Sequence, residues 1–457
     1  MDLNAKHEVE TGLREAVALV GDTAATYSLT DRMRRYGVPG CAIAVVRNGE
    51  IDWVAGYGVT AAGGTPVDAD TCFQAASISK VVNALAVLVL VEQGRIDLDA
   101  DINAQLQSWQ LPREDPWPDE AVTVRRLLSH TAGTSTPGFV GYVPGVAIPT
   151  VYEILDGLEP CNSAAVRVVT EPGAEFHYSG GGTTILQLLI EDVTGLPYGQ
   201  AVTELVLAPL GMDASHYQHP INRTEHPNSA HGHFITGEEL PGGGNVKPTY
   251  AAGGLWTSAR DLAQLAIAIS EMAKGRDGLL SASLAAEMLT PVPPSPHGLG
   301  PEVIGEGPSR RFRHNGTNRG FCSQMEGLLN ADGAAVVLTN GDGGNSLLGE
   351  ILRSIAAVYG WEGYSAPPVE LAEVDEDFLR ELVGHYVGNE QMTVDLEFAD
   401  GQLFMPSPYG RRLLLPTAEG QFLDTETGSV VVIERSDEEL VARVLYDGNE
   451  ILRFVKQ

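Results

Sequence analysis

The sequence contains few basic residues, few cysteines and no long uninterrupted apolar segment. Its 457 residues include 60 acidic and 29 basic side chains, which gives a formal charge of -31. Phosphate backbones and anionic lipid head groups repel a chain of this charge, so we expect neither nucleic acid nor a membrane as a partner. The longest apolar run, Val81–Val91, contains Asn83 and is too short to cross a bilayer.

The four cysteines stand in separate, mostly apolar contexts and form no Cys-x-x-Cys pair. This pattern favours buried free thiols and a reducing compartment. The first 23 residues are charged throughout and lack the basic, then apolar, then small order of a secretory signal. We therefore expect a cytoplasmic protein.

The first 360 residues mix strand and helix patterns. Residues 39–58 alternate around Asn48-Gly49, which is a strong hairpin signal. Helical periods, caps and apolar runs predict helices at 77–94, 183–195, 258–274 and 346–359, and strands at 320–329 and 334–342. Strands at both ends of the region with helices between them predict an α+β domain, in which an antiparallel sheet is flanked by helices.

The last part of the chain has a different pattern. Residues 361–377 are acidic and contain prolines, which is typical of a linker. Short alternating runs separated by turns follow, and they predict an all-β meander, a small barrel or sandwich. We expect a large domain at 1–365, an acidic linker at 366–377 and a β-barrel-like domain at 378–457.

Ser77 and Lys80 stand three residues apart in the stretch CFQAASISKVVNALAVLVLVEQG. On a helix they share a face, and the positive helix end and apolar surroundings disfavour the ammonium form of the lysine. Lys80 can then accept the proton of Ser77 and activate it as a nucleophile. The motif alone does not identify a catalytic pair, because a Ser-x-x-Lys arises by chance in roughly one such sequence in four. The surrounding sequence has to support the assignment.

Five segments, in order, resemble the serine β-lactamase and penicillin-binding-protein superfamily, in particular the branch of class C β-lactamases, D-aminopeptidases, DD-peptidases and related esterases. They are residues 73–102, 122–135, 171–182, 250–265 and 310–321. The resemblance implies the β-lactamase/transpeptidase-like fold and a reaction that needs no metal or organic cofactor. Residues 378–389 look like the start of the lipocalin-like module that some members of this branch carry.

The resemblance also implies roles for single residues. Ser77 corresponds to the acylated nucleophile, Lys80 to its basic neighbour, and Tyr178 to the tyrosine that passes a proton to the leaving group. His314 would lie at the edge of the site, hydrogen-bonded toward Tyr178 or toward a substrate carboxylate. The backbone N–H groups of Ser77 and Thr317 would form the oxyanion hole.

Three further residues complete the expected substrate-binding set. Asn315 and Gly316 follow His314, and Gly316 is expected to let a substrate backbone approach the strand closely. Gly180 stands two residues after Tyr178, where the family pattern has an asparagine that orients the lysine and the substrate amide. The change weakens the expectation of β-lactam or D-Ala-D-Ala chemistry and is expected to leave room for a bulky acyl group.

The remaining histidines carry weaker signals. His130 lies in the HTAGTS segment, which we expect to support the site structurally. Five more fall within eighteen residues in a loop without a helical pair, so we expect surface histidines and no metal site there. They are His216, His219, His226, His231 and His233.

The sequence thus predicts a serine hydrolase that forms an acyl-enzyme on Ser77. Its substrate would be a small-molecule or short-peptide acyl donor, such as a D-residue-containing peptide or a carboxylic ester, with at most weak β-lactamase activity. Two alternatives stay open. One is an acyltransferase or peptide cyclase that uses an amine or alcohol acceptor, and the other is a non-catalytic acyl-binding sensor.

Overall fold

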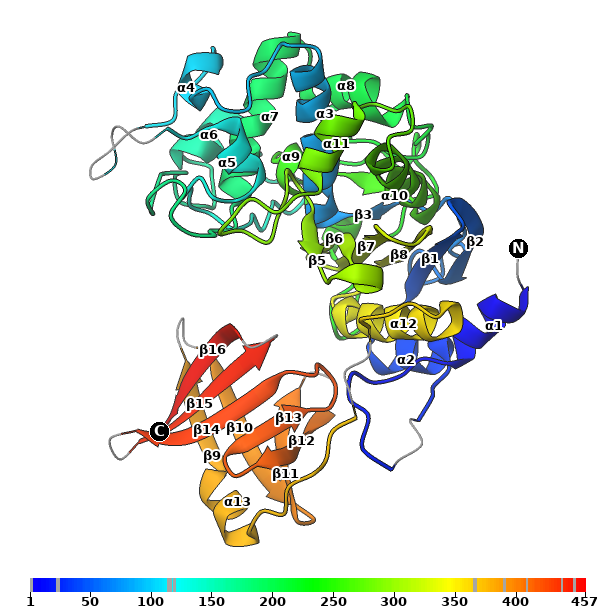
Figure 1. Cartoon of the computed structure of the whole chain (residues 1–457), viewed down its shortest axis with the longest axis vertical. Coiled ribbons are helices and arrows are strands. Elements are labelled where there is room, and N and C mark those ends of the chain that lie inside the picture. The colour runs from blue at the N-terminus through cyan, green and yellow to red at the C-terminus, as the bar shows by residue number, and fades with distance from the viewer. Residues whose placement is uncertain are drawn as a thin grey trace. The chain divides into compact units, whose positions relative to one another are not determined.

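The computed structural model describes residues 3–21, 25–112, 117, 121–364, 368–388, 392–407, 410–436, 439–446 and 449–457. They form two compact units, one mainly from Gly37–Leu348 and the other from Asn4–Tyr36 with Gly349–Gln457 (Figure 1). The bounds of these two units differ from the three expected ranges, which were 1–365, 366–377 and 378–457. The expected boundary at 365/366 lies outside the described residues, and that three-part division stays a prediction.

The first unit is built on an antiparallel six-stranded sheet with the order β2-β1-β8-β7-β6-β5. Asn48 and Gly49 have φ of 54° and 76°, as the tight hairpin turn between β1 and β2 requires. Strand β1 also pairs with β8 from nearly 300 residues later, for example Ala44 with Val336. The strands are β1 Gly40–Arg47, β2 Glu50–Gly58, β5 Glu302–Ile304, β6 Arg311–Asn318, β7 Phe321–Leu328 and β8 Gly333–Thr339.

Helix α3, Ser79–Glu92, forms the centre of this unit, and every side chain from Ser79 to Leu90 is buried. It packs against α7 (Gly180–Thr194) and α9 (Tyr250–Gly253), whereas α10 (Ala259–Ala273) lies against β1, β7 and β8. The predicted helices and the α+β fold are confirmed. The shorter elements are β3 Phe73–Gln74, α4 Ile102–Gln105, α5 Val124–Leu128, α6 Val151–Asp156, α8 Tyr198–Val202, β4 Trp256–Thr257 and α11 Ala282–Met288.

The second unit contains a closed eight-stranded barrel, which confirms the predicted all-β meander. Apolar side chains fill its interior, among them Tyr386, Leu414 and Phe422, and the barrel is therefore packed rather than hollow. Helix α13, Glu376–Leu382, adds Leu379 and Leu382 to this core. The strands are β9 Gly384–Gly388, β10 Thr393–Ala399, β11 Gln402–Ser407, β12 Gly410–Ala418, β13 Gln421–Asp424, β14 Val430–Ser436, β15 Glu439–Tyr446 and β16 Asn449–Lys456.

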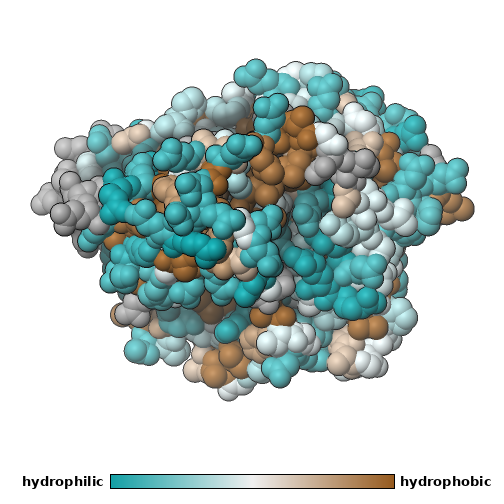
Figure 2. Space-filling view, turned by 90° about the horizontal axis from the view of Figure 1, so that it is seen from below, coloured by the Kyte–Doolittle hydropathy of each residue, from teal (hydrophilic) through white to brown (hydrophobic). Residues whose placement is uncertain are grey.

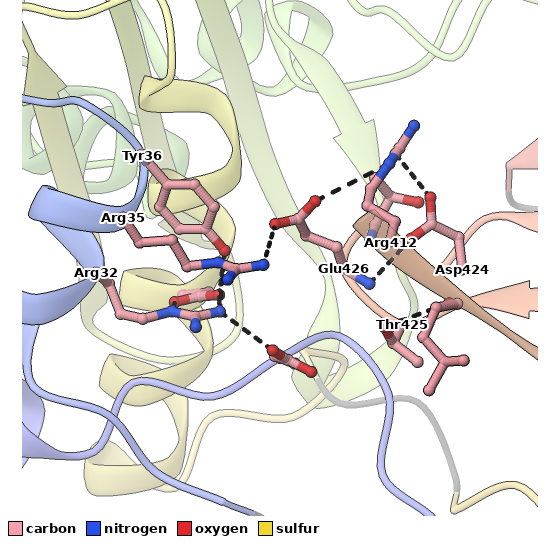
Figure 3. A network of polar contacts seen from close by, with 11 residues as sticks. Arg32, Arg35, Tyr36, Arg412, Asp424, Thr425 and Glu426 are labelled. Atoms are coloured by element: carbon pink, nitrogen blue, oxygen red, sulfur yellow. Dashed lines mark hydrogen bonds and ion pairs between the residues drawn. The ribbon is translucent and has the colours of Figure 1, made fainter. Parts of the chain in front are cut away.

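A buried polar network joins helix α2 (Leu29–Arg35) to α12 (Gly344–Tyr359) in the second unit. Helix α1 (Leu3–Thr11) is joined to α12 by Ser354 Oγ, which donates to Val9 O at 2.8 Å. Arg32 Nε donates to the Glu350 carboxylate at 2.6 Å, and the Tyr36 hydroxyl donates to the same carboxylate at 2.7 Å. Next to it, Arg35 reaches Glu426 of the barrel at 3.3 Å (Figure 3).

The Glu350 carboxylate is 1% exposed and the Arg32 side chain 5%, so each charge depends on the other. We expect Glu350→Gln, which keeps the shape but removes the counter-charge, to lower the free energy of unfolding by about 3–5 kcal/mol in urea denaturation. Glu381→Gln, which breaks the exposed pair with Arg435, is the matched control and should cost about 1 kcal/mol or less. Equal effects of the two substitutions would contradict this assignment.

Three of the four cysteines are buried, and Cys161 is partly exposed. Burial raises the pKa of Cys72 and of Cys322 to about 12 and raises that of Cys41 further. Since the thiolate is the reactive form, one thiol should react rapidly with Ellman's reagent in the native protein and four after denaturation. A Cys161→Ser variant should lose the fast phase, and a fast phase that persists would show that a buried thiol is accessible.

The described helices include none that is both long and apolar enough to span a membrane. On the face drawn in Figure 2, hydrophilic residues cover most of the surface and hydrophobic residues gather in separate patches. This agrees with the acidic composition of the chain.

Candidate active site

Ser77 lies in a 3-10 turn, Ala76–Ile78, between β3 and α3. The preceding Ala76 has φ of 48°, a left-handed conformation that costs a non-glycine residue on the order of 1–3 kcal/mol. The turn is fixed by Ser79, whose hydroxyl donates to Ala76 O and accepts from Leu255 N at 3.0 Å. Among residues 71–80 Ser77 alone is not fully buried, so the turn presents this side chain to the outside.

Lys80 lies one turn further along and points back to Ser77. Its Nζ is 3.0 Å from Ser77 Oγ and donates to Ala252 O at 2.8 Å. The residue is 4% exposed, and in the described part of the chain no carboxylate pairs with it. The structure therefore brings the two residues of the Ser-x-x-Lys motif together as the sequence predicts.

Ser77 and Lys80 open into a cavity of about 620 Å³ in the first unit. Thr317 also lines it, whereas His314, Asn315 and Gly180 are not among the lining residues. The full lining is Ser77, Lys80, Gly138, Phe139, Val140, Lys247, Thr249, Ala252, Gly253, Thr317, Asn318, Arg319 and Asp342.

Gly316 has a different role from the expected one. A β-carbon there would lie 2.2 Å from Ala75 O and 2.5 Å from Ser323 Oγ, which itself donates to Ala75 O at 2.8 Å. The protein's own backbone, not a substrate, therefore requires this glycine. It lets β6 pack directly on the turn that carries Ser77.

Tyr178 immediately precedes the N-cap of α7 and lies against Lys80, whose Nζ is 5.0 Å from the centre of its ring. Three histidines, each at most 6% exposed, surround the tyrosine ring. The ring centroids are 4.3 Å apart for His130, 6.0 Å for His297 and 6.3 Å for His314. These three histidine rings separate Tyr178 from bulk water on the side of the tyrosine ring that they cover.

Burial is the main cause that lowers the pKa of all three histidines, which are therefore neutral at pH 7. His130 Nδ1 accepts from Ser179 N at 3.2 Å and thereby holds the backbone next to Tyr178. His314 Nδ1 donates to Asn315 O at 2.7 Å, and its buried Nε2 has no partner among the described residues. The hydrogen bond expected from His314 toward Tyr178 is therefore not formed.

The family model described as "Beta-lactamase" matches residues 28–359. The chain belongs to the β-lactamase family. Esterase EstB of Burkholderia gladioli is 32% identical over 211 residues, which cover 43% of this chain and 51% of EstB. The match thus spans about half the length of this relative. The family is one of serine hydrolases, and EstB is named an esterase.

Solved structures show the same fold at lower identity. The octameric penicillin-binding protein homologue of Pyrococcus abyssi has a TM-score of 0.63 at 20% identity, over 94% of this chain and 98% of its own. The D-amino acid amidase of Ochrobactrum anthropi SV3, solved with L-phenylalanine amide, has a TM-score of 0.59 at 23% identity, over 72% and 98%. Both likenesses support the recognised fold.

The glycines at the start of α7 are in close contact with a neighbouring loop. A β-carbon at Gly180 would lie 3.0 Å from Pro137 O, and one at Gly181 would lie 2.6 Å from Ser135 O. At Gly182 the distance to Thr134 Oγ1 would be 2.6 Å. The loop at 134–138 therefore fills the space that we expected Gly180 to leave open for an acyl group.

Lys247 was not singled out in the sequence. It is 3% exposed, lines the cavity with Ser77 and donates from Nζ to Phe139 O at 2.6 Å. Burial, and to a smaller extent the charge of Lys80, lower its pKa to about 7. Two features of the sequence could have drawn attention to Lys247. Lysine is rare in this chain, with only five residues, and Lys247 stands three residues before the family-like segment at 250–265.

Of the five histidines at 216–233 only His233 is buried, and the other four are partly exposed. His233 is buried and donates from Nδ1 to Asn340 O at 2.9 Å, and His219 donates from Nε2 to Gly254 O at 2.8 Å. The rings of His216 and His226 stack at 3.6 Å. Their contacts are structural, and no group of three potential metal ligands occurs among the described residues.

Gly316 provides a direct test of the link between β6 and Ser77. We expect Gly316→Ala to displace the turn, to lower the stability by about 1–3 kcal/mol and to slow the reaction of Ser77 with a fluorophosphonate at least tenfold. Gly138→Ala is the matched control for stability, since a methyl group there meets no atom within 4 Å. Labelling of Gly316→Ala at the wild-type rate would show that the turn does not depend on this contact.

Proposed function

We propose that the chain is an acyl hydrolase in which Ser77 attacks an ester or amide carbonyl and forms an acyl-enzyme. The observation that carries the proposal is the 3.0 Å contact between Ser77 Oγ and Lys80 Nζ at the wall of a 620 Å³ cavity. Because no carboxylate in the described chain holds Lys80 as a permanent ion pair, its amine is free to exchange a proton with the serine.

The proton follows a short path. Lys80 takes the proton from Ser77 as the Oγ–C bond forms, and Tyr178, whose ring lies against Lys80, delivers a proton to the leaving alcohol or amine. Water then attacks the acyl-enzyme, and the same groups work in reverse to release the acid and restore the Ser77 hydroxyl. The neutral histidines beside Tyr178 add no charge that would compete with Lys80.

Two backbone donors can stabilise the tetrahedral intermediate. Ser77 and Thr317 both line the cavity, and β6 is fixed against the Ser77 turn through Gly316. We assign the oxyanion hole to their N–H groups, which removes part of the barrier because donors held in place need no reorganisation during the reaction. In this assignment Asn315 and His314 belong to the structure of β6 and do not line the cavity.

Small esters and amides are the proposed substrates. The esterase EstB supports an ester, and the amidase from Ochrobactrum anthropi supports a D-amino acid amide or a peptide that contains a D-residue. The family asparagine that orients a substrate amide is absent at Gly180, which favours esters among these. Transfer to an amine or alcohol uses the same acyl-enzyme and differs only in the acceptor.

The test is covalent labelling with a fluorophosphonate probe together with hydrolysis of a panel of 4-nitrophenyl esters and D- and L-amino-acid 4-nitroanilides. We expect one label on the peptide that contains Ser77. Ser77→Ala and Lys80→Met should each lower kcat/KM by on the order of a thousandfold or more, and Tyr178→Phe by about a hundredfold. Mass analysis of products with added amines distinguishes hydrolysis from transfer.

Lys274→Met is the control, because Lys274 is paired with Glu271 and Asp332 at the surface. It should retain labelling and turnover. A label on another residue, or turnover that survives Ser77→Ala, would overturn the mechanism. A label that forms without any turnover would favour the acyl-binding sensor.

A further inference from the structure

Lys247 is a buried cation that the proposed reaction does not use. It is 3% exposed and is one of only five lysines in a chain with 60 acidic residues. No carboxylate in the described residues pairs with it, and its Nζ has one recorded hydrogen bond, to Phe139 O at 2.6 Å. Removing an ammonium from water without a counter-charge costs free energy, so its position requires an explanation.

The backbone and the stem of Lys247 are fixed. Its N–H donates to His219 Nδ1 at 3.3 Å, and the adjacent Val246 exchanges two backbone hydrogen bonds with Tyr142 at 2.8 and 3.0 Å. The stem passes Gly141, where a β-carbon would lie 3.0 Å from Lys247 Cδ. Gly141 also has φ of 79°, which favours glycine. The tip of the side chain is therefore held at one place.

The ammonium group has donors to spare. It carries three N–H bonds, of which one goes to Phe139 O, so two remain for an acceptor in the cavity. The other charged lining residues are Lys80, Arg319 and Asp342, and one oxygen of Asp342 already accepts from Gly320 N. Basic side chains thus outnumber acidic ones at the cavity by three to one, although the chain as a whole carries a charge of -31.

The segment to which Lys247 bonds also lies against Gly180, where the family pattern has an asparagine. Gly138 Cα would be 3.4 Å from a β-carbon at Gly180, and the next residue, Phe139, accepts the hydrogen bond of Lys247. Lys247 thus supplies the cavity with a donor that can carry a charge, whereas an asparagine side chain is neutral.

We propose that Lys247 forms an anion subsite that binds a carboxylate on the acyl part of the substrate while Ser77 attacks the ester or amide carbonyl. This inference rests on the proposed hydrolase function and names its substrate class, acyl donors that carry a carboxylate. The two unused N–H donors would bind the carboxylate oxygens, and the bound anion would supply the counter-charge that the protein lacks.

The surroundings of Lys247 give this subsite a pH dependence. Burial lowers the pKa of His219 to about 4 and raises that of Tyr142 to about 12, so both are neutral near pH 7. The other ionisable groups that line the cavity are Lys80, Arg319 and Asp342. Because the pKa of free Lys247 is about 7, its charge is lost as the pH rises above that value, and a bound carboxylate would delay this loss. Preference for an anionic substrate should therefore decline from pH 7 to 9.

The experiment compares 4-nitrophenyl pentanoate with mono-4-nitrophenyl glutarate, two esters of equal chain length that differ in a terminal methyl or carboxylate. We expect wild type to prefer the glutarate in kcat/KM, and Lys247→Met to reduce the ratio of the two values about tenfold or more. The change should appear mainly in KM for the glutarate, and the ratio for Lys247→Met should not vary between pH 7 and 9.

Two controls separate charge from structure. Lys274→Met replaces an exposed lysine in the same way and should leave the ratio unchanged. If Lys247 only tethers the segment at Phe139, both esters will lose activity equally in Lys247→Met, and this result would overturn the subsite. A wild-type ratio near one would overturn it as well, while hydrolysis of both esters would leave the proposed function intact.

A binding measurement makes the inference independent of turnover. The Ser77→Ala protein should bind monomethyl glutarate with uptake of a proton at pH 7.5, measured by calorimetry in buffers of different ionisation enthalpy, and Lys247→Met in the same background should not. Absence of binding would refute the subsite even if fluorophosphonate labels Ser77. Absence of labelling and of hydrolysis would instead refute the proposed function, and the inference with it.

Discussion

The contact between a buried amine and a serine hydroxyl is the interaction on which the first unit depends. Lys80 can stay buried next to Ser77 only because α3 is enclosed on every side and its first turn is fixed from outside the helix. Ala76 adopts a left-handed conformation at that point, and the hydroxyl of Ser79 bonds the backbone on both sides. The apolar helix therefore provides the rigidity that a strained turn needs.

Two close approaches at glycines and one hydrogen bond extend this rigidity to the rest of the site. Gly316 lets β6 rest on Ala75, and the glycines at 180–182 let the loop at 134–138 rest on the first turn of α7. His130 completes the arrangement by holding the backbone next to Tyr178. Each contact joins segments that are far apart in the chain, so the geometry around Ser77 is set by the tertiary structure as a whole.

Local patterns were sufficient for most of the fold. The Asn48-Gly49 turn, the capped helix α10, the apolar α3 and the alternating runs of the barrel all formed where the sequence places them, because each depends on a turn, a cap or a period within a few residues. The grouping of α1 and α2 with the barrel unit could not be foreseen. It depends on the buried Arg32–Glu350 network, whose two residues are 318 positions apart.

The same distinction holds for the site. Ser77 and Lys80 were predicted because their contact is made within one helical turn. The reason for Gly316, the filled space at Gly180 and the neutral state of His314 required knowledge of which distant segment packs against each residue. A glycine has the same letter whether a substrate or the protein itself occupies the space beside it. A motif therefore indicates that a position is constrained, but it does not show which neighbour imposes the constraint.

The distribution of charge leads to a further point about the cavity. Lys6 and Lys274 are paired with carboxylates, as expected for a chain in which acidic residues outnumber basic ones by 60 to 29, and Lys456 donates to the backbone oxygen of Glu381. Lys80 and Lys247, the two lysines in the cavity, bond to uncharged oxygens in the described structure. In so acidic a chain, a carboxylate near each lysine is the arrangement of lowest electrostatic cost. Neither cavity lysine has such a partner among the described residues, and ionisable groups left unpaired in a cavity are typical of functional sites.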